Sequence, residues 1–349
     1  MHNCKKMDFK SMSRKSCLFR QKSYLLSALL TLTMLSIVIF CIYISKIESN
    51  TKNFNDDVPN EVQQNAFAVS VLSKYYNFSN GKKWFNSEII SQISKELVRE
   101  VGENWIIEKP NHTNQNYSLK FPEVKDPSMG QAEVIREIFN YAKNGFFIEC
   151  GAYDGETRSN TLNLERYYGW TGILIEADPI NFAKMTLKNR NAYLSPTCLS
   201  ITSYPTISSF LMADNIGRLH EIEDNLELTN SPDIAHKGKH INVQCFPLVT
   251  YILALNRTSI DYFSLDIEGN ELQVLETIPF HLVDIKALSV EYIHNKESKE
   301  YMIDLMKGNG YYVYSYVEHD NNLANDIIFV KETFMSSTKI KSNLLLNLT

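Results

Sequence analysis

A run of 23 uncharged residues, "SYLLSALLTLTMLSIVIFCIYIS" at positions 23–45, constrains this chain more than any other feature. As a helix rising about 1.5 Å per residue, the run is long enough to cross a hydrocarbon core of roughly 30 Å. A cleaved signal peptide, the alternative, usually has a shorter apolar region and small residues at a cleavage site. We therefore predict a retained transmembrane helix over residues 23–45.

The charges on the two sides of this run are unequal. Residues 1–22 hold seven basic side chains and one acid, whereas the residues after the run hold 28 basic and 39 acidic side chains. A basic flank usually stays in the cytosol, so we predict a type II, signal-anchored protein with a cytosolic tail over residues 1–22. The main part would face the lumen of the secretory pathway (endoplasmic reticulum, Golgi or endosome) or the cell exterior. Its excess of acids disfavours nucleic acid as a partner.

Sequons and cysteines agree with a lumenal location. Three cysteines, Cys150, Cys198 and Cys245, lie in the predicted lumenal part, which allows one disulfide and one remaining thiol. Because Cys150 ends a buried apolar run, we expect it in the core and predict a Cys198–Cys245 disulfide. The chain has no CxxC pair or Cys/His cluster, which disfavours structural zinc. Sequons of the glycoprotein type Asn-x-Ser/Thr begin at Asn77, Asn111, Asn116, Asn256 and Asn347.

The rest of the chain divides by its pattern. Residues 46–125 are rich in Asn, Lys and Ser and are predicted to form a lumenal stem, interrupted by one helical patch over residues 87–105. Residues 126–335 alternate apolar strand patterns with helix patterns, which indicates an α/β domain whose doubly wound sheet has helices on both faces. The last two strands are expected to pair antiparallel, residues 205–240 to form an irregular polar loop, and residues 336–349 to form a C-terminal tail.

The segment "FFIECGAYDGE" at residues 146–156 follows the first strand pattern with an acid and two glycines. In a doubly wound sheet, ligands bind beyond the carboxyl ends of the strands. Gly151 and Gly155 allow a sharp turn and a close backbone approach, and Asp154 lies between them. Glu149 ends the strand with a negative charge, which suits a cationic ligand such as S-adenosylmethionine. A tight turn without a ligand is the other interpretation of this motif.

Three further acids follow later strand patterns. Glu176 ends the second strand at the distance from the glycines where a ribose-binding acid is expected, although a solvated acid at a strand end is the alternative. Asp266 and Glu268 follow the strand "IDYFSL" and are candidates for the reaction side of a site. Asp266 could bind a substrate hydroxyl or a metal, or act as a general base. Both acids could instead cap the following helix.

These segments resemble the FkbM family of S-adenosylmethionine-dependent methyltransferases over roughly residues 126–332. The family pattern acid-x-Gly-Ala-x-x-Gly is similar to residues 149–155, and its Asp-x-Glu-Gly-x-Glu segment is similar to residues 266–271. The tail, the anchor and "GWTGILIEADP" look most like the Star branch of that family. The resemblance implies a Rossmann-like methyltransferase fold, with Glu149, Gly151 and Gly155 at the cofactor, Glu176 at its ribose and Asp266 on the reaction side.

Three functions fit this sequence. The first is a lumenal methyltransferase that acts on a hydroxyl or glycan. The second, implied by the Star-like resemblance, is an adaptor in vesicle-mediated transport that moves membrane cargo, such as growth-factor precursors, from the endoplasmic reticulum to the Golgi without catalysis. The third is a Golgi glycosyltransferase in which Asp266 and Glu268 hold a metal and a sugar nucleotide. The site predicted from the sequence therefore has two parts and no assigned metal. The cofactor-binding residues are Glu149, Gly151, Asp154, Gly155 and Glu176, and the catalytic residues are Asp266 and Glu268.

Overall fold

The structure of the protein is a computed structural model. The predicted cytosolic tail, transmembrane helix and C-terminal tail lie outside the residues that it describes. Within the described ranges, no helix is both long and apolar enough to cross a membrane. The described residues from Asn60 onward form one compact unit. The described ranges are 59–76, 83–108, 116–213, 216–219, 239–294, 298–319 and 324–335.

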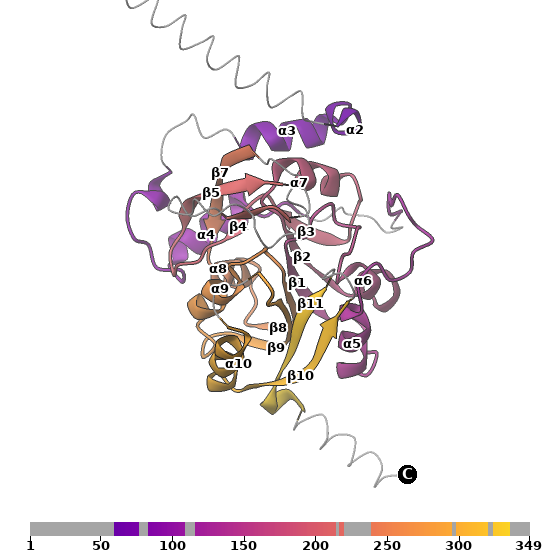
Figure 1. Ribbon diagram of the computed structural model, residues 1–349. Coiled ribbons are helices and arrows are strands. Elements are labelled where there is room, and N and C mark those ends of the chain that lie inside the picture. Colours follow the sequence, from indigo (N-terminus) through magenta and orange to yellow (C-terminus); the bar gives the residue numbers. More distant parts are fainter. Residues whose placement is uncertain are drawn as a thin grey trace, which may run out of the picture. The chain divides into compact units, whose positions relative to one another are not determined.

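A mixed seven-stranded sheet forms the centre of this unit (Figure 1). The strands, in spatial order, are β3 (Ala192–Ser195), β2 (Thr171–Ile175), β1 (Phe146–Cys150), β8 (Ser259–Leu265), β9 (Asp284–Glu291), β11 (Asn325–Lys331) and β10 (Tyr311–Glu318). Neighbouring strands are parallel, except that β11 is antiparallel to both of its neighbours, β9 and β10. The chain builds the sheet outward from its central strand in one direction and later returns to build the other half, so a topological switch point lies between β1 and β8.

Helices lie on both sides of this sheet, as the alternating pattern predicted. Figure 1 shows α5 and α6 on one side and α8, α9 and α10 on the other. Helix α7 begins at Pro179, and its N-cap Asp178 accepts hydrogen bonds from the N–H groups of Ile180 and Asn181 at 2.8 and 3.1 Å. The helices are α5 (Gln131–Ile138), α6 (Leu162–Tyr168), α7 (Pro179–Thr186), α8 (Leu248–Ala254), α9 (Glu271–Thr277) and α10 (Lys299–Gly308).

A second, four-stranded sheet replaces part of the irregular loop that we expected over residues 205–240. Strand β5 has the burial pattern of a partly exposed strand without regular alternation, so its sequence gives little period-2 signal. Residues 220–238 lie outside the described part of the chain. The sheet contains β4 (Cys198–Leu199), β7 (Lys239–Phe246), β5 (Thr206–Met212) and β6 (Arg218–Leu219), in that spatial order.

Residues 59–76 and 83–108 also differ from the expected stem. Phe85, Leu97, Val101 and Trp105 are buried in the same core as the main sheet, so this described part of the stem belongs to the folded unit. The expected helical patch over residues 87–105 is shorter than predicted, because only its second half is helical. The elements of this segment are α2 (Asn60–Gln63), α3 (Ala66–Tyr75), the 3₁₀ turn η2 (Trp84–Asn86) and α4 (Lys95–Asn104).

The predicted disulfide between Cys198 and Cys245 is confirmed, and Cys150 is a buried free thiol. The two bonded cysteines lie directly opposite each other on the parallel strands β4 and β7. The bond therefore fixes the short strand β4 to the second sheet. Cys198 also lines the cavity described below, so the disulfide forms part of its wall.

Candidate functional site

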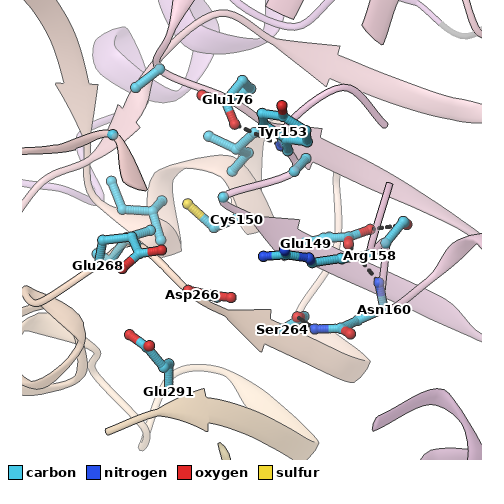
Figure 2. A pocket seen from close by; sticks show the side chains of 18 of the residues that line it. Glu149, Cys150, Tyr153, Arg158, Asn160, Glu176, Ser264, Asp266, Glu268 and Glu291 are labelled. Carbon is cyan, nitrogen blue, oxygen red and sulfur yellow. Dashed lines mark hydrogen bonds between the residues drawn. The ribbon is translucent and has the colours of Figure 1, made fainter. Parts of the chain in front are cut away.

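A cavity of about 550 Å³ lies at the carboxyl ends of the central strands, at the switch point between β1 and β8 (Figure 2). Cys150, the last residue of β1, pairs with Ile175 of β2 and with Leu265 of β8, so the ends of three strands meet there. Residues that follow these strand ends therefore reach one cavity. Of the predicted site residues, the cavity is lined by Glu149, Gly151, Glu176, Asp266 and Glu268.

The loop after β1 needs its first glycine because of a close backbone contact. Gly151 has φ +76°, and a Cβ atom at this position would overlap the carbonyl oxygen of Asp266. Glycine therefore allows the loops that follow β1 and β8 to approach each other closely. Gly155 and Asp154 do not line the cavity. Asp154 instead caps the turn, because its carboxylate accepts hydrogen bonds from the backbone N–H groups of Glu156 and Thr157 at 2.9 and 2.7 Å.

Glu149 lines the cavity, but its carboxylate is held by the loop that precedes α6. One oxygen accepts the N–H of Asn160 at 2.8 Å, and the other accepts the hydroxyls of Ser159, at 2.9 Å, and Thr161. Burial raises the pKa of Glu149, and the charge of Arg190 opposes this effect. Both carboxylate oxygens therefore have protein partners, so the observed role of Glu149 is to position residues 159–161.

Glu176 directly follows β2 and faces the cavity from the opposite side to the acids that follow β8 (Figure 2). Its two oxygens accept the backbone N–H groups of Tyr153 and Asp178, each at 2.7 Å. Burial and the neighbouring Asp178 carboxylate raise the pKa of Glu176 to about 8. Each oxygen of a carboxylate has more than one acceptor site, so Glu176 can still accept a hydrogen bond from a ligand.

Acids gather at the other end of the cavity. Figure 2 shows the carboxylates of Asp266, Glu268 and Glu291 grouped there. Glu268 has a backbone φ of +63°, which is unusual for a residue with a side chain. Burial raises the pKa of Asp266 well above its ordinary value, and the charges of Glu291 and Glu268 add to this effect.

The third acid of the predicted motif, Glu271, has a structural role. It is fully buried at the start of α9, and its carboxylate accepts hydrogen bonds from the N–H groups of Ile267, at 2.7 Å, and Gly269, at 3.0 Å. Burial, followed by the charge of Glu291, raises the pKa of Glu271 to about 8. Glu271 therefore fixes the loop that presents Asp266 and Glu268 to the cavity.

Several lining residues were missed by the sequence analysis. Arg158 is exposed, has a φ of +57° and extends into the cavity (Figure 2). His294 follows β9, and Asn325 and Asp326 begin β11. These residues come from loops and from a strand added late to the sheet, so no local motif marks them. Glu291, which ends β9, lines the same cavity.

Hydrogen bonds place His294 between two carboxylates. Its Nδ1 atom lies 2.9 Å from Glu268 Oε2 and 2.7 Å from Glu291 Oε1. Burial lowers the pKa of His294, but the hydrogen bonds and charges of the two glutamates outweigh burial and raise the pKa to about 11. Among the described lining residues, the basic side chains are Arg158 and His294, whereas six carboxyl groups line the same cavity, so acidic side chains outnumber basic ones.

Residues 149–313 match the family model described as the methyltransferase FkbM domain. This range contains all seven predicted site residues, and the predicted α/β Rossmann-like methyltransferase fold agrees with it. The family match points to S-adenosylmethionine as the cofactor, as predicted. No curated protein sequence matches the chain.

Solved structures resemble the chain at low identity. A putative sarcosine dimethylglycine methyltransferase from Galdieria sulphuraria is 10% identical, with 53% of this chain and 61% of that chain covered and a TM-score of 0.31. A TehB-like SAM-dependent methyltransferase from Corynebacterium glutamicum is 9% identical, with 58% and 88% covered and a TM-score of 0.30. LepI in complex with SAM is 11% identical, with 64% and 50% covered and a TM-score of 0.31. The aligned part thus spans less than two thirds of the first and third of these proteins.

Proposed function

We propose that this protein is an S-adenosylmethionine-dependent methyltransferase that acts on a hydroxyl group, for example of a glycan. One observation carries the proposal: a single cavity at the switch point is lined by Glu176 at the end of β2 and by Asp266 at the end of β8. A site for methyl transfer needs a cofactor and an acceptor bound side by side, and the two acids approach one cavity from different strands.

Glu176 is the residue that we assign to the ribose of the cofactor. The N–H groups of Tyr153 and Asp178 fix its carboxylate and leave acceptor capacity toward the cavity, which suits the hydroxyls of a ribose. The excess of carboxylates over basic side chains in the cavity suits the cationic sulfonium and ammonium groups of the cofactor. When bound, the cofactor supplies an electrophilic methyl group.

Asp266 is the residue that we assign to the acceptor hydroxyl. Methyl transfer forms a carbon–oxygen bond and breaks the carbon–sulfur bond, whose electron pair stays on sulfur, and the hydroxyl loses its proton. Asp266 lies at the cavity beside Gly151, so its carboxylate can accept this proton and orient the oxygen. Glu149 supports the site indirectly, because it holds residues 159–161.

We also propose that the domain lies in the lumen of the secretory pathway. The Cys198–Cys245 disulfide supports this location, because disulfides persist in oxidising compartments. Asn116 and Asn256, the two sequon asparagines within the described residues, are both exposed. The transmembrane helix over residues 23–45 and the cytosolic tail belong to the same proposal.

Methyl transfer can be tested with S-adenosylmethionine labelled in the methyl group and a panel of glycans and other hydroxyl acceptors. The measured quantity is labelled product together with released S-adenosylhomocysteine. We expect Asp266→Asn, which keeps the shape of the side chain, to slow transfer by about 10²-fold or more while cofactor binding persists. Bound cofactor with no transfer to any acceptor would instead favour the Star-like adaptor that moves membrane cargo without catalysis.

A further inference from the structure

The acidic end of the cavity has features that neither cofactor binding nor proton transfer requires. We use the name acidic cluster for Asp266, Glu268, Glu291 and Asp326 together with His294, all of which line the cavity. Four carboxylates thus face one imidazole in a confined space. Arg158, the other basic lining residue, comes from the loop after β1.

Three members of the acidic cluster are arranged like metal ligands. One atom each from Glu268, Glu291 and His294 lies within 4.8 Å of the other two. The loop that carries Glu268 is fixed against the turn that carries His294, because a Cβ atom at Gly269 would lie 2.8 Å from the carbonyl oxygen of His294. The backbone therefore holds the two ligand-bearing segments in contact before any ion binds.

Asp326 provides an independent sign of a cationic ligand. This residue is 2% exposed, and Oδ2 accepts a hydrogen bond from Gln131 at 2.8 Å. The other oxygen, Oδ1, is buried and has no hydrogen-bond partner within the described part of the chain. A buried carboxylate oxygen without a donor costs free energy unless a ligand supplies the missing partner.

The sheet register strengthens this sign. Asp326 on β11 lies directly opposite Glu291 on β9 in an antiparallel pair, and both side chains are buried. Side chains that face each other in such a pair are about 5 Å apart, and like charges there are destabilising. A cation between or beside the two carboxylates would turn this repulsion into attraction.

We propose that the acidic cluster binds one divalent cation through Glu268, Glu291 and His294, with Asp326 and Asp266 facing the ion from the other sides. The ion would take the place of the hydrogen bonds between His294 Nδ1 and the two glutamates, and the imidazole would release one proton to solvent. Two carboxylates and one imidazole suit a cation that accepts both oxygen and nitrogen ligands, and Mn²⁺ is the probe that we choose. The binding itself does not depend on the proposed function. Its role does: on that function, the ion would hold the acceptor hydroxyl and lower the pKa of that group.

The experiment is a titration of the purified full-length protein with Mn²⁺, followed by the loss of the electron paramagnetic resonance signal of free Mn²⁺. The wild type is expected to bind one ion per chain. Glu268→Gln and His294→Gln should each weaken binding by about tenfold or more, because removing a ligand costs at least as much as removing a supporting residue. Glu133→Gln, on the exposed side of α5, is the matched control and should bind as the wild type does.

Two results would overturn the proposal: no saturable Mn²⁺ binding by the folded wild type, or equal binding by Glu268→Gln, His294→Gln and Glu133→Gln. Thermal unfolding without metal shows whether each variant is folded, and only folded variants enter the comparison. If one glutamine variant fails to fold, the other still decides the outcome. Titration with S-adenosylmethionine in metal-free buffer is measured separately, so failure of cofactor binding and failure of metal binding are distinguishable.

Discussion

The backbone N–H of Tyr153 donates a 2.7 Å hydrogen bond to Oε2 of Glu176, which joins the loop after β1 to the end of β2. Together with the hydrogen bond from the N–H of Asp178 to Oε1, this contact fixes the direction of the Glu176 carboxylate, and it helps to hold the glycine-containing loop at the cavity. The two motifs that the sequence offers as separate signals are therefore parts of one hydrogen-bonded structure. Its consequences can be tested residue by residue.

Cofactor affinity should depend on pH through Glu176. Burial and Asp178 raise the pKa of Glu176 from 4.5 to about 8, so the folded protein holds a proton there that the unfolded chain has released. This group therefore makes the fold less stable as the pH rises from about 4.5 to about 8. Ribose hydroxyls donate to the ionised form, so binding should strengthen by roughly tenfold between about pH 6.5 and about pH 8.

The ligand for this pH measurement is 5′-methylthioadenosine, which keeps the ribose but lacks the titratable amino acid part of the cofactor. Its dissociation constant is measured by calorimetry across the pH range. Glu176→Gln should remove the pH dependence, and Glu133→Gln should keep it. An affinity that is flat with pH in the wild type would contradict the assignment of Glu176 to the ribose.

Glu149→Ala should destabilise the fold even though the residue lines the cavity. The change removes the acceptor of Ser159, Asn160 and Thr161, which are buried with it. Hydrogen bonds to charged groups are strong, so we expect a loss of about 3 kcal/mol in the free energy of unfolding. Urea denaturation measures it, with Glu133→Ala, expected to change stability by about 0.5 kcal/mol or less, as the surface control. A change as small as that of the control would show that residues 159–161 do not need Glu149.

Gly151→Ala should be much more harmful than Gly310→Ala. Both glycines have a positive φ, of +76° and +81°, so both substitutions carry a backbone cost of about 1–2 kcal/mol. A Cβ atom at Gly151 would also overlap the Asp266 carbonyl oxygen, whereas a Cβ at Gly310 meets nothing within 4 Å. We expect an extra loss of about 2 kcal/mol in stability and weaker cofactor binding for Gly151→Ala alone. Similar unfolding midpoints for the two variants would mean that the loops after β1 and β8 are not in close contact.

Reduction of the Cys198–Cys245 disulfide should lower stability without unfolding the main sheet. The bond closes a segment whose ends are 47 residues apart, for which chain entropy gives about 4 kcal/mol. Thermal unfolding of the wild type with and without reductant measures the effect, and a Cys198→Ala/Cys245→Ala variant should not respond to reductant. Equal melting temperatures of the oxidised and reduced wild type would contradict this account.

Much of the site could be predicted because its main residues lie next to strand patterns in the sequence. Glu149 and Glu176 each end an apolar run that forms a buried strand, and a parallel sheet brings such ends together. Asp266 and Glu268 follow the same rule after β8. What the pattern could not reveal is which carboxylates keep acceptor sites open toward the cavity and which, like Asp154, serve a turn.

Residues from outside these patterns were missed because tertiary structure alone brings them to the site. Asp326 reaches Glu291 only through the antiparallel pairing of β11 with β9. Arg158 lies in a loop whose conformation no local motif specifies. Ile89 and Ile93 fitted a helical stripe, yet they are 80% and 47% exposed and precede α4, because the helix begins only after its N-cap, Ser94.

Local backbone conformation, rather than the period of the apolar residues, also determines where a helix ends. Helix α5 ends at Ile138, and Asn140, Tyr141 and Asn144, which follow it, have positive φ values. An apolar stripe does not specify these left-handed residues, although asparagine tolerates them better than most side chains do. Gly169, in contrast, ends α6 in the left-handed conformation that glycine adopts readily and that is typical of a helix C-terminus.

The most direct test of the central claim is calorimetric titration of the purified full-length protein with S-adenosylmethionine, with Glu176→Gln and Glu133→Gln measured in parallel. The account predicts micromolar binding to a single site, weakened by about tenfold or more in Glu176→Gln because a charge-assisted acceptor of the ribose is lost, and unchanged in Glu133→Gln. Absence of binding by the folded wild type, or equal affinity of all three proteins, would contradict a cofactor site at this cavity.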